Sequence, residues 1–322
     1  MNLGALALAS MRPIHRGLDV MKKRTKILIF LISAGLALGV TLYPLVSNYL
    51  GEKNRSLVET RYEKTVQKMD NSEIVAAKQA AMAYNETLLT IPAKAFSKEA
   101  LQKAGESYAC LLDVRGDGIM GYIEIPKIGV NLPIYHGTSE ETLDRGVGHL
   151  LGSSLPAGGT GTHCVLTGHS GLAGQKMFSD LDQLELLDVF YLKVLDETLA
   201  YSVIEINTVL PEDTSELAIN PQGDDVTLIT CTPYGLNTHR LLVRGTRIGY
   251  EMAEQMVEEA HFEETPVKST WTQEYLRGIG IGCLGIAFLA SVVALIRSLP
   301  KKACQRKEAK HMEKRRGKHE TP

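Results

Sequence analysis

The sequence contains the stretch Val226-Thr-Leu-Ile-Thr-Cys-Thr-Pro-Tyr-Gly-Leu-Asn-Thr-His-Arg240. It begins as a short apolar, β-branched run, which predicts a buried strand that ends at Cys231. Pro233 and Gly235 then predict a turn, after which a second strand begins at Arg240. The thiol and the guanidinium should therefore lie at the same end of two neighbouring strands. A rigid sheet would position both groups while the loop leaves them accessible, which favours a reactive site.

A cysteine needs a partner to act as a nucleophile. The thiolate is the reactive form, and a thiol with an ordinary pKa of about 8.5 is mostly protonated at neutral pH. A nearby base or cation is therefore required. The best candidate is His169, because the apolar run Cys164-Val-Leu-Thr-Gly-His169 ends by presenting a polar group. We therefore expect Cys231 as nucleophile, His169 as acid and base, and Arg240 as stabiliser of the developing oxyanion.

Each of these residues also has a plain structural interpretation. Cys231 could be a buried strand cysteine and Arg240 a surface charge. Other histidines compete with His169, namely His136, His149, His163, His239 and His261. Spacing alone does not choose among them, although strand alternation would point His239 away from the face of Arg240. The neighbours of the cysteine, Thr230 and Thr232, are equally consistent with substrate binding and with a structural role.

These motifs resemble those of the sortases. Thr227-Leu-Ile-Thr-Cys231 is similar to the T-L-x-T-C signature of that family, Thr167-Gly-His169 to its catalytic histidine strand, and Arg240 to its essential arginine. Further stretches between residues 116 and 249 resemble the class C sortases, which polymerise pilins: Gly116-Asp-Gly-Ile-Met-Gly-Tyr-Ile-Glu-Ile-Pro-Lys-Ile, Leu132-Pro-Ile-Tyr-His-Gly-Thr-Ser-Glu-Glu and Gly146-Val-Gly-His-Leu. The resemblance implies an eight-stranded β-barrel with Cys231, His169 and Arg240 as its catalytic residues.

The periodicity from Met120 onward is that of short strands. The expected strands are Met120–Ile125, Val130–Tyr135, Thr162–Gly168, Asp188–Val194, Thr198–Leu210, Val226–Cys231 and Arg240–Tyr250, with a short one near Gly148–Leu151. The stretch Lys176–Leu187 is more helical in pattern. Many short strands with few helices favour a closed barrel. The expected fold is mainly β, a closed sortase-type barrel with N-terminal helices and two flanking transmembrane helices.

The charge distribution indicates a membrane protein. The 322 residues carry a net charge of only −2. Residues 1–26 nevertheless carry +5 and residues 297–322 carry +7, so the middle of the chain carries −14. Basic ends around an acidic middle favour a membrane topology over nucleic-acid binding.

Two uncharged apolar runs adjoin the basic ends. Ile27–Val46 has 20 residues and Gly278–Ile296 has 19, and each is long enough to cross a bilayer. Flanking Lys and Arg residues predict both termini in the cytoplasm and residues 47–277 outside, in a multi-pass cell-membrane protein. The alternatives are a cleaved signal peptide for the first run and a buried core helix for the second. Because Met21 opens an ordinary membrane-protein start, it is an alternative to Met1 as the start of translation.

The chain is therefore expected to divide into seven parts. These are a cytoplasmic segment (1–26), a transmembrane helix (27–46), a helical stalk with a possible lid (47–115), the catalytic barrel (116–250), a tether (251–277), a second transmembrane helix (278–296) and a basic cytoplasmic tail (297–322). Asp70 and Glu73 have the spacing of a capping box before a second helix of the stalk.

The region 89–115 and the cysteines leave questions open. The resemblance implies a lid with an Asp-Pro-aromatic triad, which this sequence lacks. Phe96 could be the plugging ring, or it could pack on the barrel or start a helix over Ser97–Gly105. Cys110 and Cys164 could form a disulfide or be two small buried apolar residues.

Together these features indicate a membrane-anchored cysteine transpeptidase. By resemblance, it would cleave an LPxTG-type sorting signal between Thr and Gly and join the acyl group to a lysine amine of a pilin subunit. The alternatives are a sortase that anchors surface proteins to a peptidoglycan amine, a cysteine peptidase that releases to water, and a non-enzymatic scaffold. No cofactor or metal is expected, because Gly158-Gly-Thr-Gly161 lacks a phosphate-loop ending and no His, Cys or carboxylate cluster has metal-ligand spacing. The exact sorting motif, the acceptor and the organism stay open.

Overall fold

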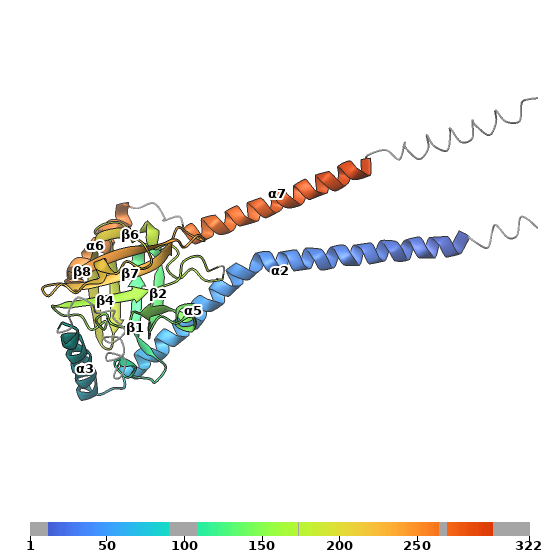
Figure 1. Ribbon diagram of the computed structural model, residues 1–322. Helices are drawn as coiled ribbons and strands as arrows, with labels where there is room; N and C mark the ends of the chain where they lie inside the picture. Colours follow the sequence, from blue (N-terminus) through green and yellow to red (C-terminus); the bar gives the residue numbers. More distant parts are fainter. Residues whose placement is uncertain (1–11, 90–107, 173, 264–268, 299–322) are drawn as a thin grey trace, which may run out of the picture. The chain divides into compact units, whose positions relative to one another are not determined.

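The structure is a computed structural model that describes residues 12–89, 108–172, 174–263 and 269–298. It divides into two units, Met1–Trp271 and Thr272–Pro322. The strands are β1 (Ile119–Ile125), β2 (Val130–His136), β3 (Val147–His149), β4 (Thr162–Thr167), β5 (Val189–Val194), β6 (Glu197–Val209), β7 (Asp224–Thr232) and β8 (His239–Ile248) (Figure 1). The helices are α2 (Arg12–Val66), α3 (Asn71–Leu89), α5 (Glu140–Arg145), α6 (Tyr250–Glu263) and α7 (Thr270–Ser298), with short 3-10 turns η1 (Pro126–Ile128), η2 (Leu181–Gln183) and η3 (Ser215–Leu217).

The eight strands close into a barrel in the order β1-β2-β3-β4-β7-β8-β6-β5. This confirms the expected mainly-β, eight-stranded fold. Two neighbouring pairs, β2 with β3 and β4 with β7, are parallel, whereas the other pairs are antiparallel. Closure leaves no sheet edge among these strands, so their backbone groups find partners within the barrel.

Large apolar side chains fill the barrel. Among the largest buried side chains are Tyr201, Phe178 and Phe190, together with aliphatic residues of every long strand, whereas Tyr122 is buried on the outer face against Tyr62 of α2. Phe190 and Tyr201 stack with ring centroids 5.5 Å apart. Gly245 lies against this pair, where a Cβ atom would come within 2.5 Å of the Phe190 ring. Glycine is therefore required at that position by close packing.

The stretch Lys176–Leu187, expected to be helical, is instead a series of turns around η2. The backbone amide of Glu185 donates a 2.6 Å hydrogen bond to the Asp188 carboxylate, and Leu187 has a φ of 75°. Local side-chain acceptors thus compete with helix formation here. The reverse omission is α5, a short helix that the strand pattern did not predict and that Ser139 caps through the amide of Thr142.

The N-terminal helices pack against the barrel. Asp70 and Glu73 form the expected capping box at the start of α3, with reciprocal hydrogen bonds of 2.9 and 3.0 Å. One side of the stalk 47–70 faces the barrel, because Tyr62 and Val66 near the end of α2 are buried. The Tyr62 hydroxyl donates to the Met120 carbonyl at 3.0 Å and accepts from the Leu195 amide at 3.0 Å.

Part of the expected tether 251–277 is helical. Its first residues belong to α6, which packs on β5 and β6 through Ala253. The described acidic residues of α6 are exposed, whereas Ala253 on its apolar side is buried against the barrel. Residues 264–268 lie outside the described residues, as do Phe96 and Ser97–Gly105 of the expected lid region.

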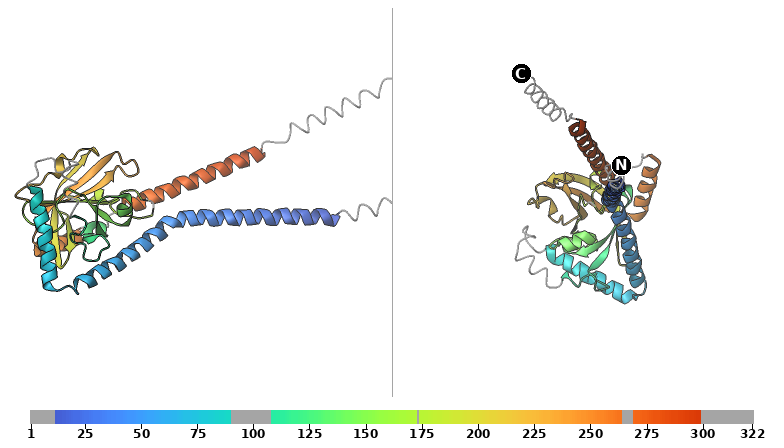
Figure 2. Two further views of the ribbon diagram at one scale, coloured as in Figure 1. Left: turned by 60° about the horizontal axis from the view of Figure 1, so that its bottom comes forward. Right: turned by 90° about the vertical axis from the view of Figure 1, so that its right-hand side faces the viewer.

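Among the residues that the structure describes, two helices are long and apolar enough to cross a membrane by length and composition, namely α2 and α7. The expected spans 27–46 and 278–296 lie within them. Their apolar side chains are exposed, as for Leu36 at 70% and Leu284 at 72%, which suits a lipid environment. Pro44 lies inside α2, and that helix bends along its length in Figure 2.

A buried hydrogen-bond network anchors the residues around Tyr108 to the barrel. The Tyr108 hydroxyl lies 2.8 Å from Nδ1 of His149, whose Nε2 donates to the Ser154 carbonyl at 2.8 Å. Burial lowers the pKa of His149 to about 4. The nearby Cys110 is exposed, Cys164 is buried, and both are free thiols. Cys110 and Cys164 therefore form no disulfide in this structure, and only Cys164 is a small buried residue.

Replacing Tyr62 by Phe should loosen the contact between α2 and the barrel. The buried Leu195 amide would lose its acceptor, so the free energy of unfolding should fall by about 1–3 kcal/mol. Thermal unfolding of the full chain in detergent measures the change. Tyr49→Phe, the same substitution at an exposed position of α2, should leave the melting temperature unchanged, and equal effects of the two variants would contradict the prediction.

Acid should destabilise the barrel through His149. Its pKa in the folded protein, about 4, is below the ordinary value near 6.5, so the unfolded chain binds the additional proton. The stability that neutral His149 provides is complete above pH 6.5 and is lost as the pH falls towards 4, by up to about 3 kcal/mol. We expect His149→Gln to be less stable at pH 7.5 but to lose less stability between pH 7.5 and 4.5. Parallel pH slopes in thermal unfolding would exclude this role.

Candidate active site

Cys231 and Arg240 are direct neighbours across two strands. β7 and β8 are antiparallel, and Cys231 pairs with Arg240 while Thr232 pairs with His239. Side chains of directly opposed residues lie on the same face, with Cβ atoms about 4.5–5.5 Å apart. The thiol and the guanidinium therefore share one face at the loop end of the hairpin.

The strand that leads to His169 lies on the other side of β7. β4 is parallel to β7 with Thr167 opposite Ile229, and extending this register by two residues sets His169 beside Cys231. Two hydrogen bonds continue the pairing past the end of β4. The Gly168 amide donates to the Ile229 carbonyl at 3.0 Å, and the Thr230 hydroxyl donates to the Gly168 carbonyl at 2.8 Å.

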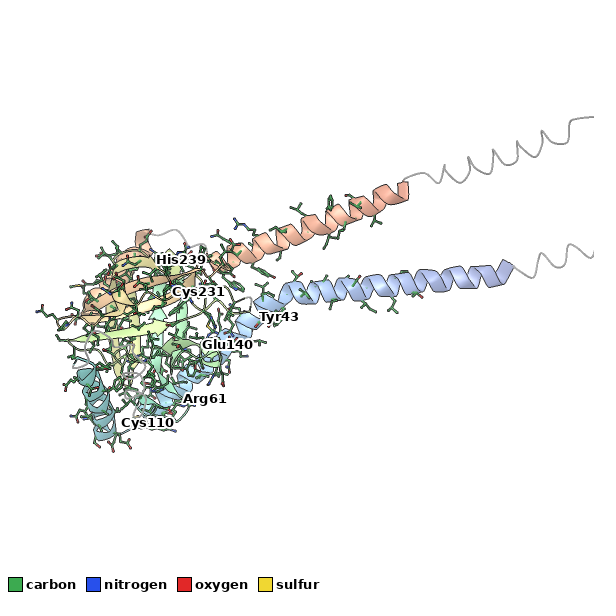
Figure 3. The ribbon with its side chains drawn as sticks, in the orientation of Figure 1. Tyr43, Arg61, Cys110, Glu140, Cys231 and His239 are labelled. Atoms are coloured by element: carbon green, nitrogen blue, oxygen red, sulfur yellow. The ribbon has the colours of Figure 1, made fainter. Side chains whose placement is uncertain are left out.

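The loops that follow the cysteine and the histidine contact each other. A Cβ atom at Gly171 would lie 3.5 Å from the Gly235 amide nitrogen. The peptide bond between Thr232 and Pro233 is cis, and Asn237 has a φ of 58°. Figure 3 shows Cys231 and His239 together at the β7–β8 end of the barrel, well away from Cys110. The candidate site is thus assembled from three strand ends and two touching loops.

The three candidate residues are half-buried, which leaves them accessible to a substrate. Arg240 donates from Nη1 to the carbonyls of Asn237 and His239, at 3.3 and 3.1 Å. These contacts hold the guanidinium near the loop. On the other side, Asp144 of α5 places Oδ1 3.9 Å from Nε2 of His169. Sequence reasoning did not identify Asp144, because it precedes His169 by 25 residues and lies in a helix that was not expected.

Three of the competing histidines, His136, His149 and His163, have other roles. His149 and His163 are buried, and both ring nitrogens of each are engaged. Burial also lowers the pKa of His163. His136 lies between the carbonyls of Gly118 and Leu111. None of these three rings is presented to a substrate.

The second barrel cysteine differs from Cys231 in its surroundings. Burial raises the pKa of the Cys164 thiol well above its ordinary value, so this thiol is unsuited to nucleophilic attack. Thr230 is also buried and bonded to Gly168, which favours the structural interpretation of that residue.

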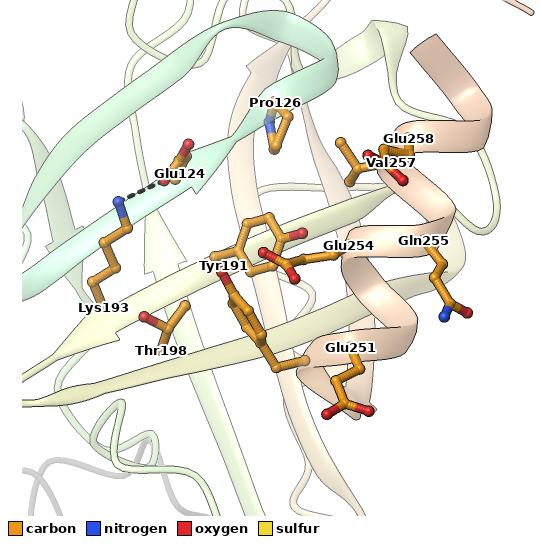
Figure 4. A pocket seen from close by; sticks show the side chains of 11 residues that line it. Glu124, Pro126, Tyr191, Lys193, Thr198, Glu251, Glu254, Gln255, Val257 and Glu258 are labelled. Carbon is orange, nitrogen blue, oxygen red and sulfur yellow. Dashed lines mark ion pairs between the residues drawn. The ribbon is translucent and has the colours of Figure 1, made fainter. Parts of the chain in front are cut away.

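A cavity of about 740 Å³ lies elsewhere on the barrel, beside α6. Figure 4 shows its lining of Tyr191, acidic residues of α6 and the Glu124–Lys193 ion pair, which measures 2.7 Å. Tyr250, the first residue of α6, also lines it and follows the C-terminal end of β8 by two residues. Arg240 lies near the opposite end of that strand. This cavity is therefore separate from the candidate active site.

Comparison with known proteins identifies the family. A sortase-domain model matches residues 123–248. Sortase D of Bacillus subtilis is 27% identical over 68% of this chain and 96% of its own length. The crystal structure of sortase C1 from Streptococcus agalactiae is 43% identical, with a TM-score of 0.55, over 60% of this chain and 98% of that one.

A second solved structure gives the same result. Sortase C of Streptococcus pneumoniae is 44% identical, with a TM-score of 0.54, over 60% of this chain and 97% of that one. The closed barrel, the cysteine at the end of β7 and these similarities agree with one another. The chain accordingly belongs to the sortase family of cysteine transpeptidases.

Proposed function

We propose that this sortase is a membrane-anchored, pilin-polymerising enzyme of class C. It cleaves an LPxTG-type sorting signal between Thr and Gly and joins the new acyl group to a lysine amine of a pilin subunit. The observation that carries the proposal is the convergence of the Cys231, His169 and Arg240 positions at the ends of β7, β4 and β8. The pneumococcal relative is a sortase C described for its pilin substrate specificity, which supports the substrate class.

In the first half-reaction, the Cys231 thiolate attacks the carbonyl carbon of the threonine. A C–S bond forms, and the carbonyl oxygen takes the negative charge in the tetrahedral intermediate. Arg240 donates hydrogen bonds to that oxygen. As the intermediate collapses, the C–N bond to glycine breaks, and protonated His169 gives its proton to the leaving amine.

In the second half-reaction, the lysine amine attacks the thioacyl carbon. Neutral His169 accepts a proton from the attacking nitrogen, the new C–N bond forms, and the C–S bond breaks. Cys231 leaves as a thiolate and His169 is again protonated, so the starting state is restored. The product is an isopeptide bond.

The proposed topology places both termini in the cytoplasm and the barrel outside. The apolar helices α2 and α7 support this proposal, and the basic residues at both chain ends support its orientation. Because the substrates of such an enzyme are also held in the membrane, anchoring raises their effective concentration at the site.

Cys231→Ala should abolish product formation. The full chain in detergent is incubated with an LPxTG peptide and a lysine-bearing pilin peptide, and conjugates are detected by mass spectrometry. Cys110→Ala, which removes an exposed thiol elsewhere, should retain activity. If the wild type gives only hydrolysed peptide, or a conjugate only with a peptidoglycan amine, the peptidase or wall-anchoring alternative replaces the proposal.

Arg240→Lys should lower kcat by at least about 100-fold. Lysine keeps the charge but cannot reproduce the planar pair of donors that an oxyanion accepts, and loss of such donors costs about 10²–10³-fold in kcat. Steady-state kinetics with the same peptides give kcat. Arg247→Lys, at the other end of β8, is the matched control, and similar losses in both variants would argue against a catalytic guanidinium at position 240.

A further inference from the structure

The backbone of His169 is held by the residues that follow it, 170–172 and 174–180, which we call the 170–180 segment. The Phe178 amide donates to the His169 carbonyl at 3.0 Å, and the Gly171 amide donates to the Ser179 hydroxyl at 3.1 Å. The ring of Phe178 packs so closely on Gly168 that a Cβ atom there would lie 2.6 Å away. The position of the 170–180 segment therefore determines the position of His169.

Helix α2 holds this segment directly after the first apolar run. The Lys176 amide donates to Oδ1 of Asn48 at 3.0 Å, and Arg55 donates from Nη1 to Oε1 of Gln175 at 2.7 Å. Asn48 lies two residues beyond Val46, the last residue of the expected span. Arg55 is itself buried, so this contact is shielded from solvent.

The first residues of α7 hold the same segment. The Trp271 amide donates to Oδ1 of Asp180 at 3.2 Å, and its indole Nε1 donates to the Leu172 carbonyl at 3.1 Å. Trp271 is the only tryptophan of the chain and is 6% exposed. Asp180 is fully buried and also pairs with Lys176 at 2.8 Å. Trp271 precedes the second expected span by seven residues.

The segment also reaches the other neighbour of His169. Nε2 of Gln175 donates to the backbone carbonyl of Asp144 at 3.1 Å. Asp144 is the residue whose carboxylate lies 3.9 Å from His169. Through Gln175, contacts therefore connect Arg55 to His169 by two routes, one along the backbone of the 170–180 segment and the other through the end of α5.

We propose that Asn48, Arg55 and Trp271 are positioning residues for His169. The two helices that carry the apolar spans make their contacts with the same short segment, so anchoring and catalysis are coupled through it. These residues do not touch the substrate; they restrict the segment to the arrangement in which His169 lies beside Cys231. This inference rests on the proposed role of His169 in the transpeptidase reaction.

The test uses single substitutions in the full chain, in detergent or lipid nanodiscs. Asn48→Ala removes the acceptor for the Lys176 amide, whereas Asn48→Asp retains an acceptor oxygen. Trp271→Phe removes the indole donor and retains an aromatic ring. Asn54→Ala makes the same change as Asn48→Ala at an exposed position of the same helix and is the matched control.

We expect Asn48→Ala and Trp271→Phe each to lower kcat by about threefold to tenfold, as the loss of one hydrogen bond does, with KM unchanged. Hydrogen exchange in the 170–180 segment should become faster in both. Asn48→Asp should recover at least about half of the wild-type kcat, and Asn54→Ala should equal the wild type. Rates are expressed per folded molecule, so lost stability alone does not lower them.

The inference is overturned if kcat stays within about twofold of the wild type in both variants, or if Asn54→Ala loses as much as Asn48→Ala. If the wild type does not act on the peptides, the proposed function fails and the positioning role is judged without turnover. In that case, faster exchange together with a changed rate of Cys231 alkylation supports it, and an unchanged alkylation rate overturns it.

Discussion

The parallel pairing of β4 with β7 is the constraint on which the site depends. Parallel strands end at the same edge of a sheet, so the residues after Thr167 and after Ile229 emerge together although they are about 60 positions apart in the chain. The Thr230 hydroxyl extends this alignment by one residue through its hydrogen bond to Gly168. A shift of this register by one residue would reverse the face that each side chain occupies, so Cys231 and His169 would no longer lie together.

The same barrel holds two cysteines in opposite environments. Cys164 belongs to the interior of β4, where burial disfavours its thiolate. Cys231 is the second-to-last residue of β7. It lies directly opposite Arg240 and is half-exposed. The Cys231 thiol is accessible because β7 ends there. The cation that faces it, Arg240, comes from β8. Reactivity is therefore a property of position within the sheet more than of the residue type.

Local pattern predicted the strands, and the three candidate site residues that it selected lie at neighbouring strand ends. It failed where long-range contacts decide the conformation. Each expected strand is present because its alternation is read over neighbouring residues. Lys176–Leu187 was misjudged because, besides its local side-chain acceptors, it bonds to residues far away in the chain: the Lys176 amide to Asn48 and the Asp180 carboxylate to Trp271. Asp144 was missed for a similar reason, since only the folded chain brings α5 to His169. The burial of Tyr62 likewise depends on strands that follow it by more than 50 residues.

Two of these failures, Lys176–Leu187 and Asp144, concern residues around the loop that carries His169. A small barrel positions strand residues rigidly. The connection after β4 leaves the sheet, so contacts outside the sheet have to hold it in place. It obtains hydrogen bonds from α2 and from the start of α7, elements whose composition is otherwise suited to lipid. The conformation of the loop that carries His169 therefore depends on hydrogen bonds from α2 and α7, and it could not be predicted from the loop's own residues.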